Sequence, residues 1–268
     1  MKHAYCLVTL FVSFTPVSLS IILQTPPPEH AWQSLFDGRS LTDWRGFRAG
    51  KPPSSWEVHN GTIHRKPGVK EDDGGDLCSV RQFQDFELDF EWKISKGGNS
   101  GVKYLVQEGR PASWERASYA YAAGELRKRK DEEARKELRK LTVARFWRFP
   151  IGFEYQIVDP EHPDSRKSEK RVTAALYDIL APTNARPVRG GFNNSRIAVQ
   201  SGRIQHWLNG VKVLEFRQDS PEIRQAYKNS KFRDIKGFGL IRRGHICIQD
   251  HGDEVWFRSI RIRSFPQI

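Results

Sequence analysis

Residues 85–94 read Asp-Phe-Glu-Leu-Asp-Phe-Glu-Trp-Lys-Ile, and apolar and charged side chains alternate along this stretch at every step. Successive side chains of a β-strand point to opposite faces, so the pattern predicts a strand with one face in a core and one polar face. After Asp85, the polar set contains three more acids, Glu87, Asp89 and Glu91. We therefore expect a sheet whose second face carries chemistry.

Short strand-like runs separated by turn signals continue over the rest of the chain. The pairs Asn60-Gly61, Ser201-Gly202 and Asn209-Gly210 each divide two such runs, and pairs of this kind favour tight hairpins. Further expected strands cover residues 56–59, 62–64, 101–106, 152–158, 174–180, 196–200, 203–208, 211–216, 239–241, 245–250 and 255–262. This density of short strands predicts an all-β, antiparallel β-sandwich.

Two segments depart from the strand pattern. Residues 117–141 are highly charged, with apolar side chains at roughly helical spacing, and predict a short inserted helix. Its mixed charges are typical of a solvated surface helix, although a helix between two groove-lining strands could also gate the groove. Residues 220–229 begin Ser-Pro-Glu, an N-cap followed by proline at the first helical position, so a second short helix is expected there.

The N-terminus resembles an export signal. Residues 1–20 combine a positive start, an apolar run and small residues at 18 and 20, as a cleavable signal peptide does. The alternative is a membrane anchor that extends to Leu23. Residues 21–31 contain three consecutive prolines and predict a linker, so the folded domain is expected to span residues 32–268. The protein is then exported, periplasmic or extracellular, without stable membrane insertion after signal removal.

The net charge and the cysteine content indicate which partners and which covalent links to expect. The formal net charge is +12, but the basic residues are scattered among acids, so no nucleic-acid partner is expected. Cys6 would leave with the signal, and Cys78 and Cys247 remain. An exported location permits a disulfide between them, but two buried free thiols are the commoner outcome for cysteines so far apart in sequence.

Polar residues alternate with apolar ones on several expected strands, which suggests a polyol-binding groove. Solvent-facing positions would explain many of them equally well. Trp207 and Asn209 also share a strand face, and an aromatic ring beside an amide is a common platform for a sugar; a core position for Trp207 is the alternative. The groove candidates are Glu87, Asp89, Glu91, Asn99, Lys103, Glu154, Gln156, Gln249 and His251.

Parts of the sequence also suggest two more specific chemistries, a retaining glucanase and a metal site. Glu87 and Glu91 resemble the paired carboxylates of retaining β-glucanases, but residues four apart on a strand lie about 13 Å apart. Retaining hydrolysis needs the carboxyl groups about 5–5.5 Å apart. No zinc signature is present; His162 could join Asp159 in a metal site, but a turn built on Pro163 and Asp164 explains that stretch better.

An ordered series of motifs resembles the 3-keto-disaccharide hydrolase family. The series covers about 230 residues from Leu35 onward, and its order is more specific than any single piece. The matching stretches are LFDGRSL at 35–41, DFEL at 85–88, GNSGVKY at 98–104, GFEYQIVD at 152–159, ALYD at 175–178, HWLNGVK at 206–212, SKF at 230–232, QDHG at 249–252 and VWFR at 255–258.

The resemblance implies a concanavalin A-like jelly roll that acts on glycosides already oxidised at C3. A C3 ketone acidifies the C2 proton, so a base can remove that proton and the C1 substituent can leave by β-elimination. Water addition then completes a net hydrolysis. Such chemistry needs a base, an acid and a group that stabilises the enolate.

The resemblance also implies residue roles. His251 and Glu154 would be the base and the acid, in either order, and Lys103 or a bound divalent cation would stabilise the enolate. Sugar binding is expected at Asn99, Gln156, Tyr177, Trp207, Gln249 and Asp250. A non-catalytic carbohydrate-binding module or lectin on the same fold is the alternative, and it would need no proton-transfer group.

Overall fold

Two antiparallel β-sheets face each other in the computed structural model, which describes residues 31–69, 75–108, 150–233, 235 and 238–266. The larger sheet contains β1 Gln33–Ser34, β3 Trp56–His59, β4 Thr62–Arg65, β6 Phe86–Ile94, β9 Asn193–Gln200, β10 Arg203–Leu208, β11 Val211–Arg217 and β13 Val255–Ser264. The smaller sheet contains β2 Trp44–Gly46, β5 Leu77–Phe83, β7 Asn99–Val106, β8 Phe153–Val158 and β12 Gly244–Ile248.

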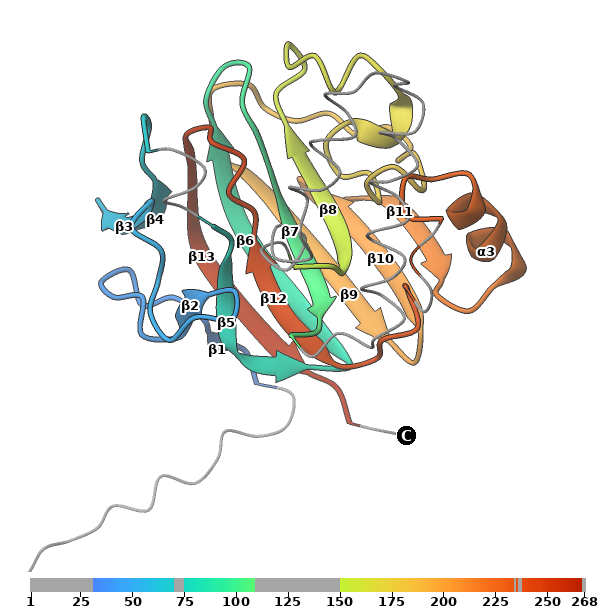
Figure 1. The fold of residues 1–268 in the computed structure, drawn as a ribbon, viewed down its shortest axis with the longest axis horizontal. Coiled ribbons are helices and arrows are strands. Elements are labelled where there is room, and N and C mark those ends of the chain that lie inside the picture. Colours follow the sequence, from blue (N-terminus) through green and yellow to red (C-terminus); the bar gives the residue numbers. More distant parts are fainter. Residues whose placement is uncertain (1–30, 70–74, 109–149, 234, 236–237, 267–268) are drawn as a thin grey trace, which may run out of the picture.

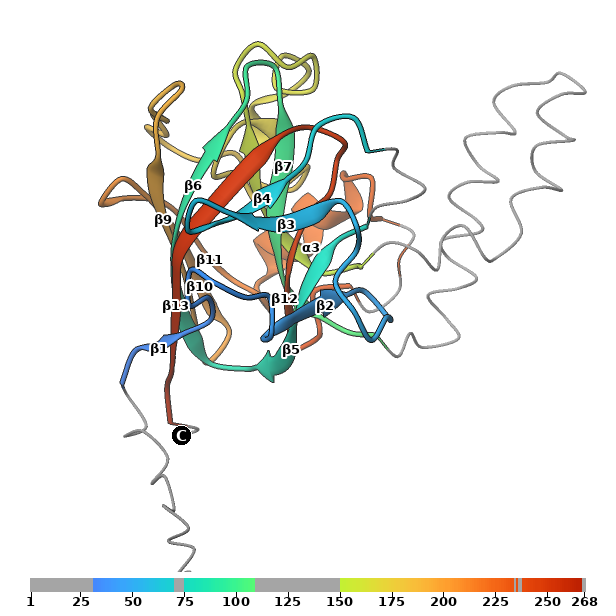
Figure 2. The ribbon, with the colours of Figure 1, turned by 90° about the vertical axis from the view of Figure 1, so that its left-hand side faces the viewer.

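The strands alternate repeatedly between the two sheets along the chain. The larger sheet has the order β11-β10-β9-β6-β13-β4-β3 with β1 paired to β13, and the smaller has the order β2-β5-β12-β7-β8 (Figure 1). Seen from the side, the sheets form two layers (Figure 2). The predicted all-β antiparallel sandwich is confirmed, and the repeated crossing between layers is the connectivity of a jelly roll.

Alternation along the strands fills the space between the layers. On β6, Phe86, Leu88, Phe90 and Trp92 are at most 1% exposed, as the sequence pattern predicts. Phe90 meets Tyr155 of β8 edge to face, with ring centroids 5.8 Å apart. Full burial of each such side chain contributes about 1.5–3 kcal/mol, so this interlayer packing is the main source of stability.

One polar group lies in the middle of this core. His206 on β10 is fully buried; its Nδ1 donates to the Ala174 carbonyl and its Nε2 accepts from the Tyr104 hydroxyl, both at 2.9 Å. Burial lowers the pKa of His206 to about 4. Because His206 points inward, its neighbour Trp207 points outward, and the alternative of a core position for Trp207 is wrong.

Some expected elements differ from the observed ones. Residues 174–180 are not a strand: Ala174 and Asp178 have φ of 68° and 61°, and only isolated bridges form at Leu176. The stretch is mostly apolar because it packs Leu176 into the core from a folded loop. Residues 239–241 also lie outside any strand.

The helix expected near residue 220 is confirmed as α3, Pro221–Lys228, with the Ser220 hydroxyl accepting from the Ile223 amide. The expected signal peptide at 1–20, most of the linker at 21–31 and the inserted helix at 117–141 lie outside the described residues. Within the described part of the chain, no helix has the length and apolar character needed to cross a bilayer.

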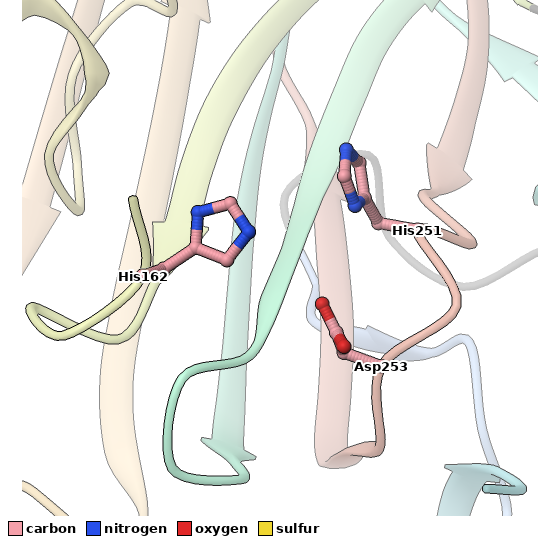
Figure 3. A group of neighbouring side chains, drawn as sticks. All are labelled: His162, His251 and Asp253. Atoms are coloured by element: carbon pink, nitrogen blue, oxygen red, sulfur yellow. The ribbon is translucent and has the colours of Figure 1, made fainter. Parts of the chain in front are cut away.

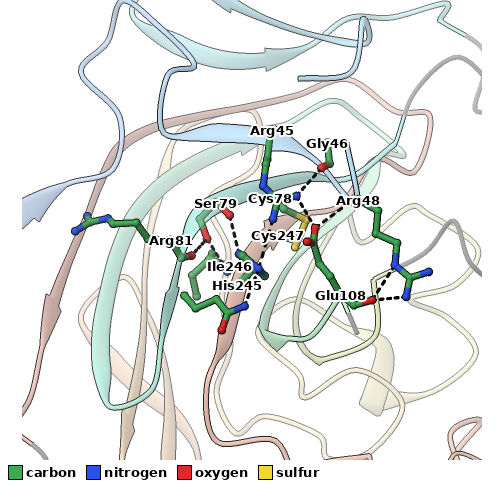
Figure 4. Close-up of polar contacts among 11 residues, drawn as sticks. Arg45, Gly46, Arg48, Cys78, Ser79, Arg81, Glu108, His245, Ile246 and Cys247 are labelled. Atoms are coloured by element: carbon green, nitrogen blue, oxygen red, sulfur yellow. Dashed lines mark hydrogen bonds and ion pairs between the residues drawn. A yellow bond between two sulfur atoms is a disulfide. The ribbon is translucent and has the colours of Figure 1, made fainter. Parts of the chain in front are cut away.

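A disulfide joins β5 to β12. Cys78 and Cys247 face each other directly in the register, with Cα atoms 4.0 Å apart, and both are fully buried (Figure 4). The expectation of two free thiols is therefore wrong. The cysteines are separated by 169 positions in the sequence, and the antiparallel register of β5 and β12 brings them together.

Candidate functional site

Lys103 and Glu154 form a cross-strand pair on the outer face of the smaller sheet. Val102 and Tyr104 of β7, and Phe153 and Tyr155 of β8, point into the core, so the residues between them point away from it. Lys103 and Glu154 are direct partners in the β7–β8 register, and each is 6% exposed. Two of the three predicted catalytic side chains are therefore neighbours, and both are largely buried.

Glu154 is a buried carboxyl surrounded by cationic groups. Burial raises its pKa, while the charges of Lys103, Lys231 and His251 act in the opposite direction. Within the described part of the chain, no ion pair at salt-bridge distance engages its carboxylate. A carboxyl of this kind can gain and lose a proton nearer neutral pH than an exposed glutamate does.

Gly101 supports the position of Glu154. A Cβ at residue 101 would lie 2.8 Å from Glu154 Oε1 and 3.0 Å from its Cγ, so the glutamate side chain lies directly over the glycine. The Gln156 amide, oriented to donate, reaches Glu154 Oε1 at 3.2 Å and the Ser100 carbonyl at 2.9 Å. The GNSG motif thus matters because bare backbone is needed beneath this carboxylate.

A buried ion network holds Lys103 in place. Its Nζ donates to Asp76 Oδ2 at 2.7 Å, and Asp76 also accepts from the Asp250 amide at 3.1 Å. Asp250 in turn pairs with Arg65, which is fully buried, at 2.9 Å. Both Asp250 carboxylate oxygens accept bonds from protein groups, including the Gly75 and Gly252 amides, so Asp250 supports the site, and its role in binding sugar hydroxyls stays a prediction.

Lys231 and Tyr177 lie above this strand pair on loops. The Lys231 Nζ is 3.9 Å from the centre of the Tyr177 ring, and the Lys231 amide donates to Asp178. Burial lowers the pKa of Lys231, and the nearby charge of Lys103 acts in the same direction. The Tyr177 hydroxyl donates to Asp164 Oδ2 at 2.7 Å, which leaves its ring as a wall beside Lys231.

His251 lies beside His162 and Asp253 (Figure 3). The ligand-type atoms of the three residues are within 4.8 Å of one another, and the two imidazole rings meet edge to face. Asp253 Oδ2 accepts from the Asn99 amide at 2.9 Å, which ties this group to the start of β7. His162 also occupies the expected Pro-Asp turn rather than a metal site with Asp159.

The donor types in this group suit a divalent metal, but the hydrogen bonds do not. His162 Nδ1 accepts from the Asp164 amide at 3.0 Å, so the neutral ring carries its proton on Nε2. A protonated Nε2 donates hydrogen bonds and cannot bind a metal. The arrangement therefore offers His251 and Asp253 as ligands, fewer than the three protein ligands of a typical catalytic zinc site.

Two further predicted binders reach the same face. Asn99 is 3% exposed and lies beside Gln156. Gln249 follows β12, and within the described residues its buried Oε1 has no hydrogen-bond partner, so it is available to a ligand hydroxyl. The smaller sheet and its loops thus bring together His251, Glu154, Lys103, Asn99, Gln156, Tyr177 and Gln249.

The acidic strand and Trp207 do not join this group. Glu87, Asp89 and Glu91 lie on β6 of the larger sheet and point to its outer face, so their expected place near His251 is wrong. Glu87 pairs with Arg196 and Arg263, and Glu91 with Arg258. Carboxylates held in such pairs do not provide the free acid and nucleophile that a retaining glucanase needs.

Trp207 also belongs to the larger sheet, where the Arg196 guanidinium lies over its ring. Its predicted role in binding sugar at the same site is therefore wrong. Sequence reasoning missed Asp76, Lys231 and Asp253 and gave His162 no part beside His251. Lys231 lies in the quoted SKF motif, but nothing in the local sequence indicated that it would reach Glu154.

Comparisons with known proteins agree with this picture. A curated relative, the 3-keto-disaccharide hydrolase of Bacteroides thetaiotaomicron, is 33% identical over 90% of this chain and 81% of its own length. A candidate glycosyl hydrolase from Parabacteroides distasonis is 25% identical with a TM-score of 0.65, over 88% of this chain and 94% of its own. A second from that organism, 22% identical with a TM-score of 0.58 over 88% and 100%, shares the fold.

The model of the 3-keto-alpha-glucoside-1,2-lyase-like domain matches residues 31–263, which include both sheets and every residue of the Glu154 site. The resemblance inferred from the motifs is confirmed. This chain belongs to the 3-keto-alpha-glucoside-1,2-lyase-like domain family.

Proposed function

We propose that the protein cleaves glycosides that carry a ketone at C3 of the sugar. The observation that supports this most is the buried Glu154 carboxyl, which lies over Gly101 and is surrounded by Lys103, Lys231 and His251. The proposed net reaction is hydrolysis in two stages, β-elimination followed by water addition. The name of the Bacteroides relative supports a disaccharide as substrate.

Glu154 is the proposed base. Its carboxylate removes the C2 proton, the electron pair forms an enolate on C3, and the C1–O bond breaks as the enolate collapses to an enone. The departing oxygen takes a proton from His251. Water then adds to C1 and a proton returns to C2, so that both residues end in their starting states. Proton transfer by a positioned side chain contributes typically about 10²–10⁴-fold to the rate.

The two lysines have different electrostatic roles. The Lys103 ammonium is held by Asp76, so it acts mainly to keep Glu154 ionised. Lys231 lies close enough to Glu154 to interact with its charge and, among the described residues, forms no ion pair at salt-bridge distance. We assign Lys231 to the developing enolate oxygen, where a preorganised cation is most effective. Asn99, Gln156 and Gln249 then bind the remaining hydroxyls.

Turnover of oxidised and unoxidised substrate tests the proposal. The protein is incubated with a 3-keto glucoside and with its unoxidised parent, and the released aglycone is measured. We expect release from the oxidised compound alone and, with C2-deuterated substrate, a primary kinetic isotope effect. Efficient cleavage of the unoxidised glycoside contradicts the elimination mechanism, and binding without turnover favours a carbohydrate-binding module.

We also propose that the protein is exported to the periplasm or the extracellular space after removal of residues 1–20. The Cys78–Cys247 disulfide supports this, since disulfides persist mainly in oxidising compartments. Fractionation of the native cells and N-terminal sequencing of the mature protein test it. A full-length chain in the cytoplasm contradicts it.

A further inference from the structure

An irregularity in β13 shapes the outer face of the larger sheet. In the pairing with β6, Arg258 faces Glu91 and Arg261 faces Asp89, and the register shifts between them. The extra residue is taken up at Ser259, whose φ is 51°, and Ile260 points into the core with 3% exposure. The bulge turns Arg258, Arg261 and Arg263 to the same outer face, where unbroken alternation would have sent the latter two inward.

The bulge also leaves a recess in that face. Only the small Ser259 side chain covers the gap between Arg258 and Arg261, and a pocket of about 510 Å³ opens there. Its walls come from β1, β6, β9 and β13 and the residue before β1. They consist of Trp32, Ser34, Asp89, Glu91, Asn194, Ser259, Ile260 and Arg261. The volume lies within the range of small-molecule sites in proteins, about 300–1,000 Å³.

The polar groups of the pocket alternate between donors and acceptors. Asp89 accepts from Asn194 Nδ2 at 3.2 Å and from Arg261 Nε at 3.4 Å. Glu91 accepts from Arg258 at 2.6 Å through Oε2. Trp32 forms the aromatic wall and is held by Arg261 and Arg263, 4.7 Å and 4.9 Å from its ring centre.

This chemistry selects one class of ligand. A free cation is disfavoured because arginines already neutralise both carboxylates, and an anion is disfavoured because those carboxylates line the pocket. A purely apolar ligand would leave the Asp89, Asn194 and Arg261 groups without water. A pyranose ring fits, since each hydroxyl both donates and accepts and its CH face packs on an aromatic ring.

We propose that the pocket beside Trp32 is a second carbohydrate site, which binds a neutral pyranose unit of a glycan. It lies on the opposite layer from Glu154, and facing sheets are about 10 Å apart before side chains are counted. A sugar here cannot reach the base. The site therefore holds glycan to the protein without turning it over, whether or not the Glu154 site acts on 3-keto sugars.

Binding of unoxidised disaccharides to the folded mature protein tests the proposal. Maltose and cellobiose are titrated while the tryptophan indole resonances are followed by NMR. We expect saturable shifts at the Trp32 resonance, with a dissociation constant of about 0.1–10 mM as suits a small ligand on an open site. Trp32→Ala and Glu91→Gln should each weaken binding at least about tenfold, measured by calorimetry because Trp32→Ala removes the reporting resonance. Glu91→Gln preserves the shape of the pocket wall, so it remains a valid test even if Trp32→Ala disturbs the fold near the N-terminal end of the domain.

Trp207→Ala is the matched control, because Trp207 lies on the same sheet face outside the pocket. It should leave binding unchanged. The proposal is overturned if neither disaccharide shifts Trp32, if Trp207→Ala abolishes binding as well, or if the shifts follow added divalent cation alone. It is also overturned if Glu154→Gln removes the binding, since the ligand would then occupy the other site.

Discussion

Glu154 carries the proposed chemistry, so an isosteric change there is the sharpest test at the scale of one residue. Glu154→Gln keeps the volume but cannot accept the C2 proton. We expect turnover of a 3-keto glucoside to fall by about 10²–10⁴-fold, measured as aglycone release, with little change in KM. Thermal stability should hold or rise, because a buried carboxylate is removed.

Glu87→Gln is the matched control for that change. Glu87 lies on the outer face of the larger sheet and pairs with Arg196 and Arg263. Its loss should leave turnover within about twofold of wild type, because Glu87 lies on the other sheet, far from the reacting atoms. If Glu87→Gln abolishes turnover and Glu154→Gln does not, the catalytic face has been assigned to the wrong sheet.

Gly101→Ala tests the support beneath the carboxylate. The new Cβ would lie 2.8 Å from Glu154 Oε1, so the carboxylate must move. We expect kcat to fall at least about tenfold because small displacements of a reacting group are costly, and stability to fall by about 1–3 kcal/mol. Gly50→Ala is the control, since nothing lies within 4 Å of its Cβ. Full activity in Gly101→Ala would contradict the assigned role of this glycine.

The charge of Lys231 should affect the pH dependence of kcat/KM. Burial raises the pKa of Glu154. The acidic limb of kcat/KM, where the base becomes protonated, should therefore lie at a higher pH than that at which an ordinary glutamate titrates. Lys231→Met removes a positive charge that favours the carboxylate. The limb should therefore move to higher pH and kcat should fall.

Lys96→Met, at a side chain 81% exposed, is the control and should change neither quantity. A limb that stays in place in Lys231→Met would show that Lys231 does not act on Glu154. A merely structural loss would lower the amplitude of the profile without moving it.

At the scale of the elements, local patterns predicted the strands well where both faces had a clear role. Residues 85–94 alternate because one face is core, and β6 follows that pattern. Residues 174–180 are instead a mostly apolar run that packs Leu176 into the core from a folded loop, and local polarity cannot distinguish such a run from a buried strand. Which sheet a strand joins is also not local, and this is why Glu87 and Trp207 were assigned to the wrong face.

The same limit applies to the site. Glu154, Lys103 and His251 could be named because each lies in a family motif. Asp76 and Lys231 reach them only through long-range contacts: the β5–β12–β7 order brings Asp76 to Lys103, and the loop after α3 brings Lys231 to Glu154. A single sequence contains no direct signal of such pairings.

The disulfide between β5 and β12 gives a prediction at this scale. Asp76 directly precedes β5 and Gln249 directly follows β12, and the antiparallel pairing of Leu77 with Ile248 places both residues at the same end of these strands, so the pairing fixes the floor of the site. The double variant Cys78→Ala/Cys247→Ala should lose about 2–5 kcal/mol of unfolding free energy, measured by urea denaturation, since a long loop is no longer closed in the unfolded chain. A thiol reductant should lower the stability of wild type toward that of the variant and leave the variant unchanged. Equal stability with and without reductant in wild type would contradict a structural bridge.

At the scale of the whole molecule, the two layers expose faces of different character. The smaller sheet gathers a poorly hydrated group of charges around Glu154, whereas the larger sheet carries carboxylates and arginines in ordered pairs. The shared core between them separates the faces. A family resemblance that covers nearly the whole chain therefore still leaves one face of the sandwich without an assigned role.

The core itself should make stability depend on pH through His206. The folded pKa is lowered to about 4, whereas an unfolded histidine titrates near 6.5, so between these values the unfolded chain binds a proton that the folded protein does not. The contribution of His206 is complete above pH 6.5 and is lost as the pH falls toward 4. The loss amounts to about 3 kcal/mol at 1.36 kcal/mol per pH unit.

Urea denaturation at a series of pH values measures this dependence, and His206→Gln should flatten it between pH 4 and 6.5. The variant will also lose stability at every pH because the bonds to Tyr104 and Ala174 change, so the slope is the quantity to compare. Carboxylates such as Glu215, whose pKa is lowered to about 2 mainly by the Lys212 hydrogen bond, act below this window. An unchanged slope in His206→Gln would show that the core histidine does not control the acid sensitivity of the sandwich.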